Sequence, residues 1–207
     1  FQQTEKLEKS EFIQTLGIPV TSILVRNNKT LIGTIQGLYI YDATSGKISK
    51  HESYGIDGPL STRISCMDMD SKGAIWIGTP IGLSALQPDG SWSSIQGTEG
   101  LPVEEITALK IDNKDRIWIG TTQGAILYKP YEEGRQWFYR AGKRYLINDV
   151  IKDIELTDGA MPVYFQTENG ISKIEKVSRT LDDKADIIET RLNGWHRRMG
   201  IVGGCQL

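Results

Sequence analysis

The stretch Trp118–Ala125 reads WIGTTQGA, and the same phrase recurs three more times along the chain. The earlier copies are Leu31–Leu38 (LIGTIQGL) and Trp76–Leu83 (WIGTPIGL), and a more divergent copy is Tyr164–Ile171 (YFQTENGI). The second glycines of the copies, at positions 37, 82, 124 and 170, are separated by 45, 42 and 46 residues. A repeat of roughly 40–50 residues built from short apolar runs and turns is typical of β-propeller blades. The period therefore predicts an all-β propeller.

Each repeat is expected to contribute four strands to one blade. An apolar run forms the first strand, and a turn rich in Asp, Asn and Gly leads into the repeated phrase, which forms the second strand. The Thr-x-x-Gly part of the phrase turns the chain into the third strand, and a fourth strand follows. The expected first strands are residues 20–25, 64–69, 106–111 and 151–156.

Four repeats predict a propeller of about four blades over residues 1–176. The blades are expected at roughly 17–58, 59–100, 101–144 and 145–176. The last repeat has only three strands, and residues 11–15 (EFIQT) would add the fourth and close the ring, which removes exposed sheet edges. The alternative is that these blades belong to a larger ring with further blades outside this chain.

Two features of the phrase have an expected packing role. Glycine inside a strand costs stability and usually marks a close backbone approach, so the glycine after isoleucine is expected to let a neighbouring blade pack closely. Trp76 and Trp118 are large enough to fill the wedge between adjacent blades. We interpret both tryptophans as core residues rather than as a platform for a ligand.

Residues 177–207 depart from the repeat pattern. Thr180 and Asp183 form a start that resembles a capping box, and apolar residues then recur at helical spacing. We expect a C-terminal α-helix, followed by the start of a linker or of a further domain that would be a partner of the propeller.

The charge balance argues against two classes of partner. The 207 residues carry 24 basic and 26 acidic side chains, a formal net charge of −2, whereas binding to nucleic acid or to a membrane surface needs a basic excess. No apolar run approaches the length of a membrane span. We therefore expect a soluble globular chain with no nucleic-acid partner and no membrane insertion.

The two cysteines and one sequon bear on the compartment. Cys66 and Cys205 fit neither a metal-ligand spacing nor a redox pair, so two free thiols and one long-range disulfide both remain open. Asn28-Lys29-Thr30 is an N-glycosylation sequon and slightly favours an exported protein.

Together these motifs resemble the two-component regulator propeller repeat, over about residues 11–176. The residues that carry the resemblance are Gly100-Leu101-Pro102, Asp112, WIGT at 118–121, Gly124, WIGT at 76–79 and Gly82-Leu83. The first copy has Leu31 in place of tryptophan, and the fourth has lost the Ile-Gly pair. The resemblance implies an extracellular or periplasmic location, because such propellers commonly form the periplasmic sensing part of bacterial sensor kinases. Related propellers occur in carbohydrate-active enzymes.

Signatures of catalysis and of cofactor binding are sparse. The chain has no phosphate-binding Gly-Lys-Ser/Thr loop and no Gly-x-Ser-x-Gly elbow, and we predict neither a cofactor nor a metal site. Asp153 is a weak catalytic candidate, because it falls on an innermost strand where the other repeats carry Ser22, Cys66 and Ala108. A charged residue there would face the channel or need a partner, and a hydrogen-bonded structural aspartate is the alternative.

By the same resemblance, ligands bind at one face of the propeller, in the loops before the first strand and between the second and third strands. Loops on a rigid scaffold often carry binding residues, and the C-terminal segment adds a cluster able to bind a sugar acid or a phosphate. The candidate ligand-binding residues are Gln36, Arg63, Glu105, Gln123, Asn148, Glu168, Trp195, His196 and Arg197.

These observations favour a non-enzymatic module that binds a glycan or a protein partner at its loop face. One alternative is a carbohydrate-active lyase or hydrolase in which Asp153 acts with Arg63 or His196. The other is a propeller scaffold within a larger multidomain enzyme.

Overall fold

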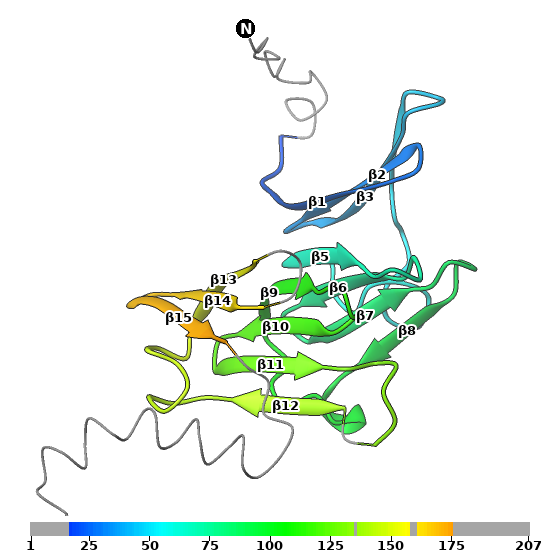
Figure 1. Cartoon of the computed structure of the whole chain (residues 1–207). Helices are drawn as coiled ribbons and strands as arrows, with labels where there is room; N and C mark the ends of the chain where they lie inside the picture. The colour runs from blue at the N-terminus through cyan, green and yellow to red at the C-terminus, as the bar shows by residue number, and fades with distance from the viewer. Residues whose placement is uncertain (1–16, 135, 158–160, 176–207) are drawn as a thin grey trace, which may run out of the picture. The chain divides into compact units, whose positions relative to one another are not determined.

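The computed structural model describes residues 17–134, 136–157 and 161–175. Within these ranges the chain forms fifteen β-strands in four antiparallel sheets, and no α-helix is present there (Figure 1). The chain divides into two units. The unit Phe1–Lys173 contains the sheets apart from the last residue of the final strand, and the other unit is Ile174–Leu207.

Each sheet is built from strands that follow one another in the chain. The first sheet contains β1 (Val20–Arg26), β2 (Lys29–Thr34), β3 (Gly37–Asp42) and β4 (Lys47–Lys50). The second contains β5 (Cys66–Met69), β6 (Ile75–Thr79), β7 (Gly82–Leu86) and β8 (Trp92–Ile95). The third contains β9 (Ile106–Ile111), β10 (Ile117–Thr121), β11 (Gly124–Tyr128) and β12 (Trp137–Arg140). The fourth contains β13 (Ile151–Leu156), β14 (Val163–Thr167) and β15 (Gly170–Ile174). Two short 3₁₀ helices, η1 (Gly55–Asp57) and η2 (Gly97–Glu99), lie in the connections between sheets.

The strands expected from the repeat are confirmed. The predicted first strands match β1, β5, β9 and β13 to within two residues, and the repeated phrase forms the second strand and the turn into the third in every sheet. Residues 11–15, expected to complete the last sheet, and the helix expected within 177–207 lie outside the described residues. The number of blades and the closure of a ring stay predictions.

The Thr-x-x-Gly turn has the same hydrogen bonds in all four sheets. In the third sheet Thr121 Oγ1 donates to Gly124 O at 2.7 Å and accepts the Gln123 N–H at 3.1 Å. The equivalent threonines of the other sheets repeat both bonds, and they are Thr34, Thr79 and Thr167. Gly124 has a φ of +134°, a conformation that residues with a Cβ rarely adopt. The phrase therefore encodes a turn as well as a strand.

The glycine after isoleucine lies where consecutive sheets pack against each other. We call the side of a sheet that meets the next sheet its following face, and the opposite side its preceding face. A Cβ atom at these glycines would clash with an isoleucine of the next sheet. The distances to Cγ2 would be 2.6 Å from Gly33 to Ile64, 2.5 Å from Gly78 to Ile106 and 2.4 Å from Gly120 to Ile151. The predicted role of this glycine in close packing is confirmed.

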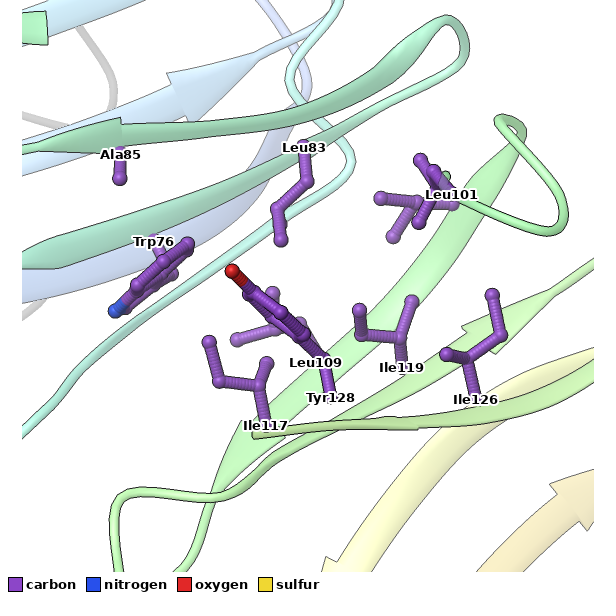
Figure 2. Packing of buried hydrophobic residues seen from close by; sticks show 10 residues of the cluster. Trp76, Leu83, Ala85, Leu101, Leu109, Ile117, Ile119, Ile126 and Tyr128 are labelled. Atoms are coloured by element: carbon purple, nitrogen blue, oxygen red, sulfur yellow. The ribbon is translucent and has the colours of Figure 1, made fainter. Parts of the chain in front are cut away.

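The junction of the second and third sheets holds a large buried cluster (Figure 2). Trp76, Leu83 and Ala85 on the following face of the second sheet pack against the preceding face of the third. The residues of the third sheet and its entry loop in this cluster are Leu101, Ile106, Leu109, Ile117, Ile119, Ile126 and Tyr128. The Trp76 and Tyr128 rings meet edge to face, with centroids 5.8 Å apart. Removal of this apolar area from water stabilises the junction by roughly 25 cal/mol per Å².

Both tryptophans of the phrase are core residues, as predicted. Trp118 is fully buried and meets Phe165 of the fourth sheet edge to face. Its indole N–H donates to Asp112 Oδ2 at 3.0 Å, and the Trp76 indole donates to Asp70 Oδ2 at 2.9 Å. The aspartate six residues before each tryptophan therefore satisfies the one polar atom of a buried ring.

Candidate functional site

A β-bulge interrupts the first strand of three sheets at the same point. In β1, β9 and β13 the pairing with the second strand skips one residue near the start of the strand. The skipped residues are Thr21, Thr107 and Lys152. A bulge bends the strand and re-aims the side chain of the extra residue, and bulges are common beside functional sites.

The three bulged residues line one cavity of about 280 Å³. Ser65, directly before β5, also lines it and follows Ile64, as Thr107 follows Ile106. Ile106, the first residue of β9, is a further lining residue. The others come from the loops before the first strands and from the Thr-x-x-Gly turns, and they are Ile35, Arg63, Ile64, Pro80 and Glu105. These are the two kinds of loop in which ligand-binding residues were predicted, so two of the candidates, Arg63 and Glu105, meet at this cavity.

Charges of both signs surround the cavity. Lys152 Nζ lies 2.9 Å from Glu168 Oε1, in an exposed ion pair. Glu105 Oε2 accepts a hydrogen bond from Thr122 Oγ1 at 3.0 Å. Arg63 is exposed, and among the described residues its guanidinium has no ion-pair partner. Two positive side chains, Arg63 and Lys152, thus face two negative ones, Glu105 and Glu168, and Arg63 is the cation of this set that makes no ion pair among the described residues.

Thr107, one of the residues that line the cavity, has an unsatisfied hydroxyl. Thr107 Oγ1 is buried and has no hydrogen-bond partner among the described residues. A buried hydroxyl without a partner is costly, and such groups are uncommon in folded proteins.

The other predicted ligand-binding residues that the structure describes lie in turns and loops. Gln36 and Gln123 are exposed in Thr-x-x-Gly turns, and the Gln123 carbonyl oxygen accepts a hydrogen bond from the Tyr139 hydroxyl. Asn148 Oδ1 accepts the Val150 N–H at 2.7 Å, which caps the loop before β13. Glu168 joins the site through its ion pair with Lys152. The candidates Trp195, His196 and Arg197 lie outside the described residues, and their role stays a prediction.

The bulge explains why sequence reasoning named Asp153 and missed Lys152. Strict alternation along the innermost strand places residues 22, 66, 108 and 153 in register, and the pairing confirms that register. The extra residue just before this position points into the cavity instead, and Asp153 is not among the cavity-lining residues. Asp153 is exposed, and its Oδ1 accepts the Ile154 N–H at 2.8 Å. A catalytic role for Asp153 stays a prediction.

A sequence signal for the missed residues does exist. Ser65, Thr107 and Lys152 each follow an isoleucine that packs on the glycine of the preceding sheet. The residue after that isoleucine is polar in every repeat, and Thr21 occupies the corresponding place after Val20.

The side chains of His51 and Cys66 contact residues of the surrounding framework. His51 is half-buried, with Nε2 3.3 Å from Asp57 O and its ring centroid 5.3 Å from that of Trp92. Cys66 is a free thiol next to Gly78, and burial raises its pKa to about 12. Cys205 lies outside the described residues.

In the described part of the chain, no three His, Cys, Asp or Glu side chains gather closely enough to hold a metal ion. None of the described helices has the length and apolar character needed to cross a membrane.

Comparison with known proteins supports the repeat assignment. Residues 100–123 match the model of the family described as two component regulator propeller. The resemblance stated from the WIGT motifs is thereby confirmed, and the matched residues run from the Gly-Leu-Pro loop through β9 and β10. A search of curated proteins finds no significant match.

Solved structures share the fold at low identity. The extracellular domain of the putative hybrid two component system BT3049 from B. thetaiotaomicron matches with a TM-score of 0.64 and 24% identity, over 75% of this chain and 21% of that one. Virginiamycin B lyase from Staphylococcus aureus matches with a TM-score of 0.54 and 14% identity, over 77% of this chain and 56% of the lyase. The computationally designed protein Ika4 matches with a TM-score of 0.55 and 14% identity, over 77% of this chain and 92% of the design. These likenesses establish a propeller-like all-β fold, and function has to be argued from the site.

Proposed function

We propose that this chain is a ligand-binding propeller module of the sensor type, and that it recognises an acidic glycan at the cavity lined by Thr21, Ser65, Thr107 and Lys152. The observation that carries the proposal is the convergence of bulged polar side chains beside an unpaired guanidinium. In this proposal the module binds its ligand without chemical change.

The cavity volume suits one sugar unit. At about 280 Å³ it lies just below the usual range of ligand pockets, roughly 300–1,000 Å³. An oligosaccharide would therefore insert a single residue, while the rest of the ligand lies across the exposed loops. Hydroxyl and carboxylate side chains such as Thr107 and Glu105 suit the hydroxyl groups of that sugar.

The unpaired charge selects the acidic sugar. A guanidinium binds a carboxylate through two parallel N–H···O bonds, and hydrogen bonds between charged groups are about twice as strong as neutral ones. Arg63 would bind the carboxylate of a uronic acid in this way. Lys152 is paired with Glu168, so Arg63 is the cation that remains to bind the carboxylate, beside the Glu105 carboxylate that also lines the cavity.

The sensor role rests on the family repeat and on the nature of the matched domain. The match at residues 100–123 is to a regulator propeller, and the BT3049 domain is described as extracellular. We place this module outside the cytoplasm on that basis. We further propose that the four sheets are four blades at 17–58, 59–100, 101–144 and 145–176, and that residues 177–207 lead into a further domain.

A glycan array tests the proposal directly. The purified chain is expected to bind uronate-containing glycans saturably, and the Arg63→Ala variant to lose this binding by roughly 10- to 100-fold, as expected for a hydrogen bond between charged groups. Lys47→Ala is the matched control, because Lys47 is an exposed cation in β4 that is not part of the cavity. The Thr107→Val variant, which removes only the buried hydroxyl, is expected to bind more weakly than the parent.

Three results would contradict the proposal. Equal losses in Arg63→Ala and Lys47→Ala would indicate nonspecific attraction to acidic glycans. Binding of neutral glycans alone would remove the role of Arg63. Consumption of the glycan over time would mean that the chain is an enzyme.

A further inference from the structure

Arg140, the last residue of β12, is half-buried and pairs with Ala125 of β11. Among the described residues its guanidinium has neither a hydrogen-bond partner nor an ion-pair partner. Burial lowers the pKa of this guanidinium, and the nearby Tyr145 acts in the opposite direction. Withdrawing a charge from water is costly unless the charge is paired. Arg140 therefore carries a positive charge that no described acid compensates.

Two further cations follow Arg140 in the loop between β12 and β13. Lys143 and Arg144 are both exposed, and the Arg144 guanidinium lies 5.4 Å from the centroid of the Tyr145 ring. Asp149 is the one acidic residue among residues 141–150, and its Oδ1 accepts a backbone N–H of the loop at 2.6 Å. The loop and the end of β12 thus form a positively charged cluster in a chain whose formal net charge is −2.

Hydrogen bonds fix the shape of the loop that carries these cations. Gly142 O accepts the N–H groups of Tyr145 and Leu146 at 2.9 Å and 3.0 Å. The Ile147 N–H donates to Ser172 Oγ of β15 at 2.9 Å, and the Leu146 side chain is buried. A preformed loop loses less conformational freedom when it binds a ligand, so the cluster is suited to recognition.

A row of paired residues leads across the third sheet from the cavity to this cluster. Ile106 lines the cavity and pairs with Thr121. Thr121 pairs with Gly124, and the residue after Gly124 pairs with Arg140. The path crosses from β9 to β12 in steps between neighbouring strands, which amounts to roughly 14 Å at the usual strand spacing. The cavity and Arg140 therefore lie at the same end of the third sheet, with the turn that contains Gln123 beside the path.

Two separate cationic sites suit a ligand that has more than one acidic group. Arg63 lies at the cavity and Arg140 on the outer strand, and neither forms an ion pair with a described residue. One sugar in the cavity cannot reach both sites, whereas a chain of sugars can. Once one end of such a chain is bound, the second contact forms within the complex, which raises the affinity without a new contact in the cavity.

We propose that Arg140, together with Lys143, is a second anion-binding subsite, and that the ligand is an oligosaccharide with several acidic sugars that extends from the cavity to the outer strand of the third sheet. This inference rests on the proposed recognition of an acidic glycan. Arg140 would bind a carboxylate through its planar fork, and Lys143 would add a point charge beside it.

Calorimetric titration with oligomers of galacturonic acid tests the proposal, from the single sugar to chains longer than the span between the two sites. The parent is expected to bind long oligomers more tightly than short ones. Arg140→Ala should bind the single sugar as the parent does and long oligomers roughly 10- to 100-fold more weakly, as expected for a hydrogen bond between charged groups. Arg63→Ala should weaken binding at every length.

Three further variants complete the experiment. Arg26→Ala is the matched control, because Arg26 is a half-buried arginine at the end of β1 away from the cavity-lining Thr21, and it should leave binding unchanged at every length. Arg140→Lys keeps the charge without the planar fork and should recover part of the loss. Lys143→Ala alters only an exposed side chain, so the fold is preserved, and it should weaken long oligomers by a smaller factor.

The outcomes separate this inference from the proposed function. Equal binding by Arg140→Ala and the parent at every length would overturn the second subsite and leave the cavity site standing. A loss in Arg140→Ala that is the same for the single sugar and for long oligomers would show a general effect on the protein and would also overturn it, as would an equal loss in Arg26→Ala. An unchanged Arg63→Ala would contradict the proposed function instead, and a parent that binds no oligomer would contradict both.

Discussion

Two regions of the molecule can be compared at equivalent register positions. At the junction of the second and third sheets these positions are packed, whereas on the following face of the fourth sheet they are more exposed. At the junction, Gly78 admits Ile106, and Trp76 is buried with its indole bonded to Asp70. On the fourth sheet, Gln166 and Tyr164 occupy those positions, and Gln166 is exposed. The difference shows that the glycine is the feature that every junction shares. Gly33, Gly78 and Gly120 are present where the next sheet packs, although Leu31 replaces the tryptophan at the first junction, and Gln166 replaces the glycine on the fourth sheet.

The largest expected effect comes from breaking the polar part of a junction. Asp112→Ala removes the acceptor of the Trp118 indole and of Arg116 Nε, which donates to Asp112 Oδ2 at 2.6 Å. Arg116 is only 6% exposed, so its charge would be left buried without a partner. We expect a loss of about 3–5 kcal/mol in the free energy of unfolding, measured by urea denaturation.

Asp89→Ala is the control for this prediction. Asp89 lies in an exposed turn and, in the described part of the chain, its side chain bonds only to Ser91, so the change should cost less than about 0.5 kcal/mol. Similar losses for Asp89 and Asp112 would contradict the account of the junction.

The next effect compares the two positions directly. Gly120→Ala places a Cβ 2.4 Å from Ile151 Cγ2, and overpacking of this kind is expected to cost about 1–3 kcal/mol. Gln166→Ala changes the equivalent exposed position and should alter stability by less than about 0.5 kcal/mol. Urea denaturation of both variants measures the contrast. A Gly120→Ala protein as stable as the parent would show that the sheets do not pack as described.

A pH effect sharpens the comparison at the same register position, where the second sheet carries Cys66 and the fourth carries exposed Asp153. Burial raises the pKa of the Cys66 thiol to about 12, so the folded chain keeps the proton at pH values where the unfolded chain loses it. The free energy of unfolding should therefore fall as pH rises above about 9, by up to about 1.4 kcal/mol per pH unit for this group. The measurement is urea denaturation between pH 8 and 11.

Cys66→Ala isolates this contribution from the tyrosines and lysines that titrate in the same range. The difference in stability between the parent and Cys66→Ala should change with pH above about 9. A difference that stays constant up to pH 11 would contradict burial of the thiol.

The smallest expected effect is at Asp153. Because this carboxylate is exposed and, among the described residues, bonds only to the adjacent amide, Asp153→Asn should change the free energy of unfolding by less than about 0.5 kcal/mol. Glycan binding by the variant should equal that of the parent. A glycan-degrading activity that disappears in Asp153→Asn would restore the catalytic interpretation.

The sequence predicts the strands and the junctions well because both depend on local and repeated patterns. The period placed Trp118 and Gly120 in the core, and the structure confirms the turn, the strand and the close contact. The site is harder to predict. Bulges shift the alternation by one residue, so Lys152 rather than Asp153 lines the cavity. Arg63 and Glu105 could be predicted because they lie in loops, whereas the unpaired Thr107 hydroxyl follows only from the packing around it.

The central claim is that Arg63 binds a carboxylate of the ligand. A thermodynamic cycle of two proteins and two ligands, measured by calorimetry, tests this claim most directly. The best uronate glycan from the array and its carboxyl-reduced counterpart are each titrated into the parent and into Arg63→Ala. If the two groups contact each other, removing either one should cost the same, and removing the second should cost little more. The account predicts that Arg63→Ala no longer distinguishes the acidic glycan from the reduced one. If the variant still prefers the acidic glycan by the parent's margin, Arg63 does not bind the carboxylate, and the proposed function is contradicted.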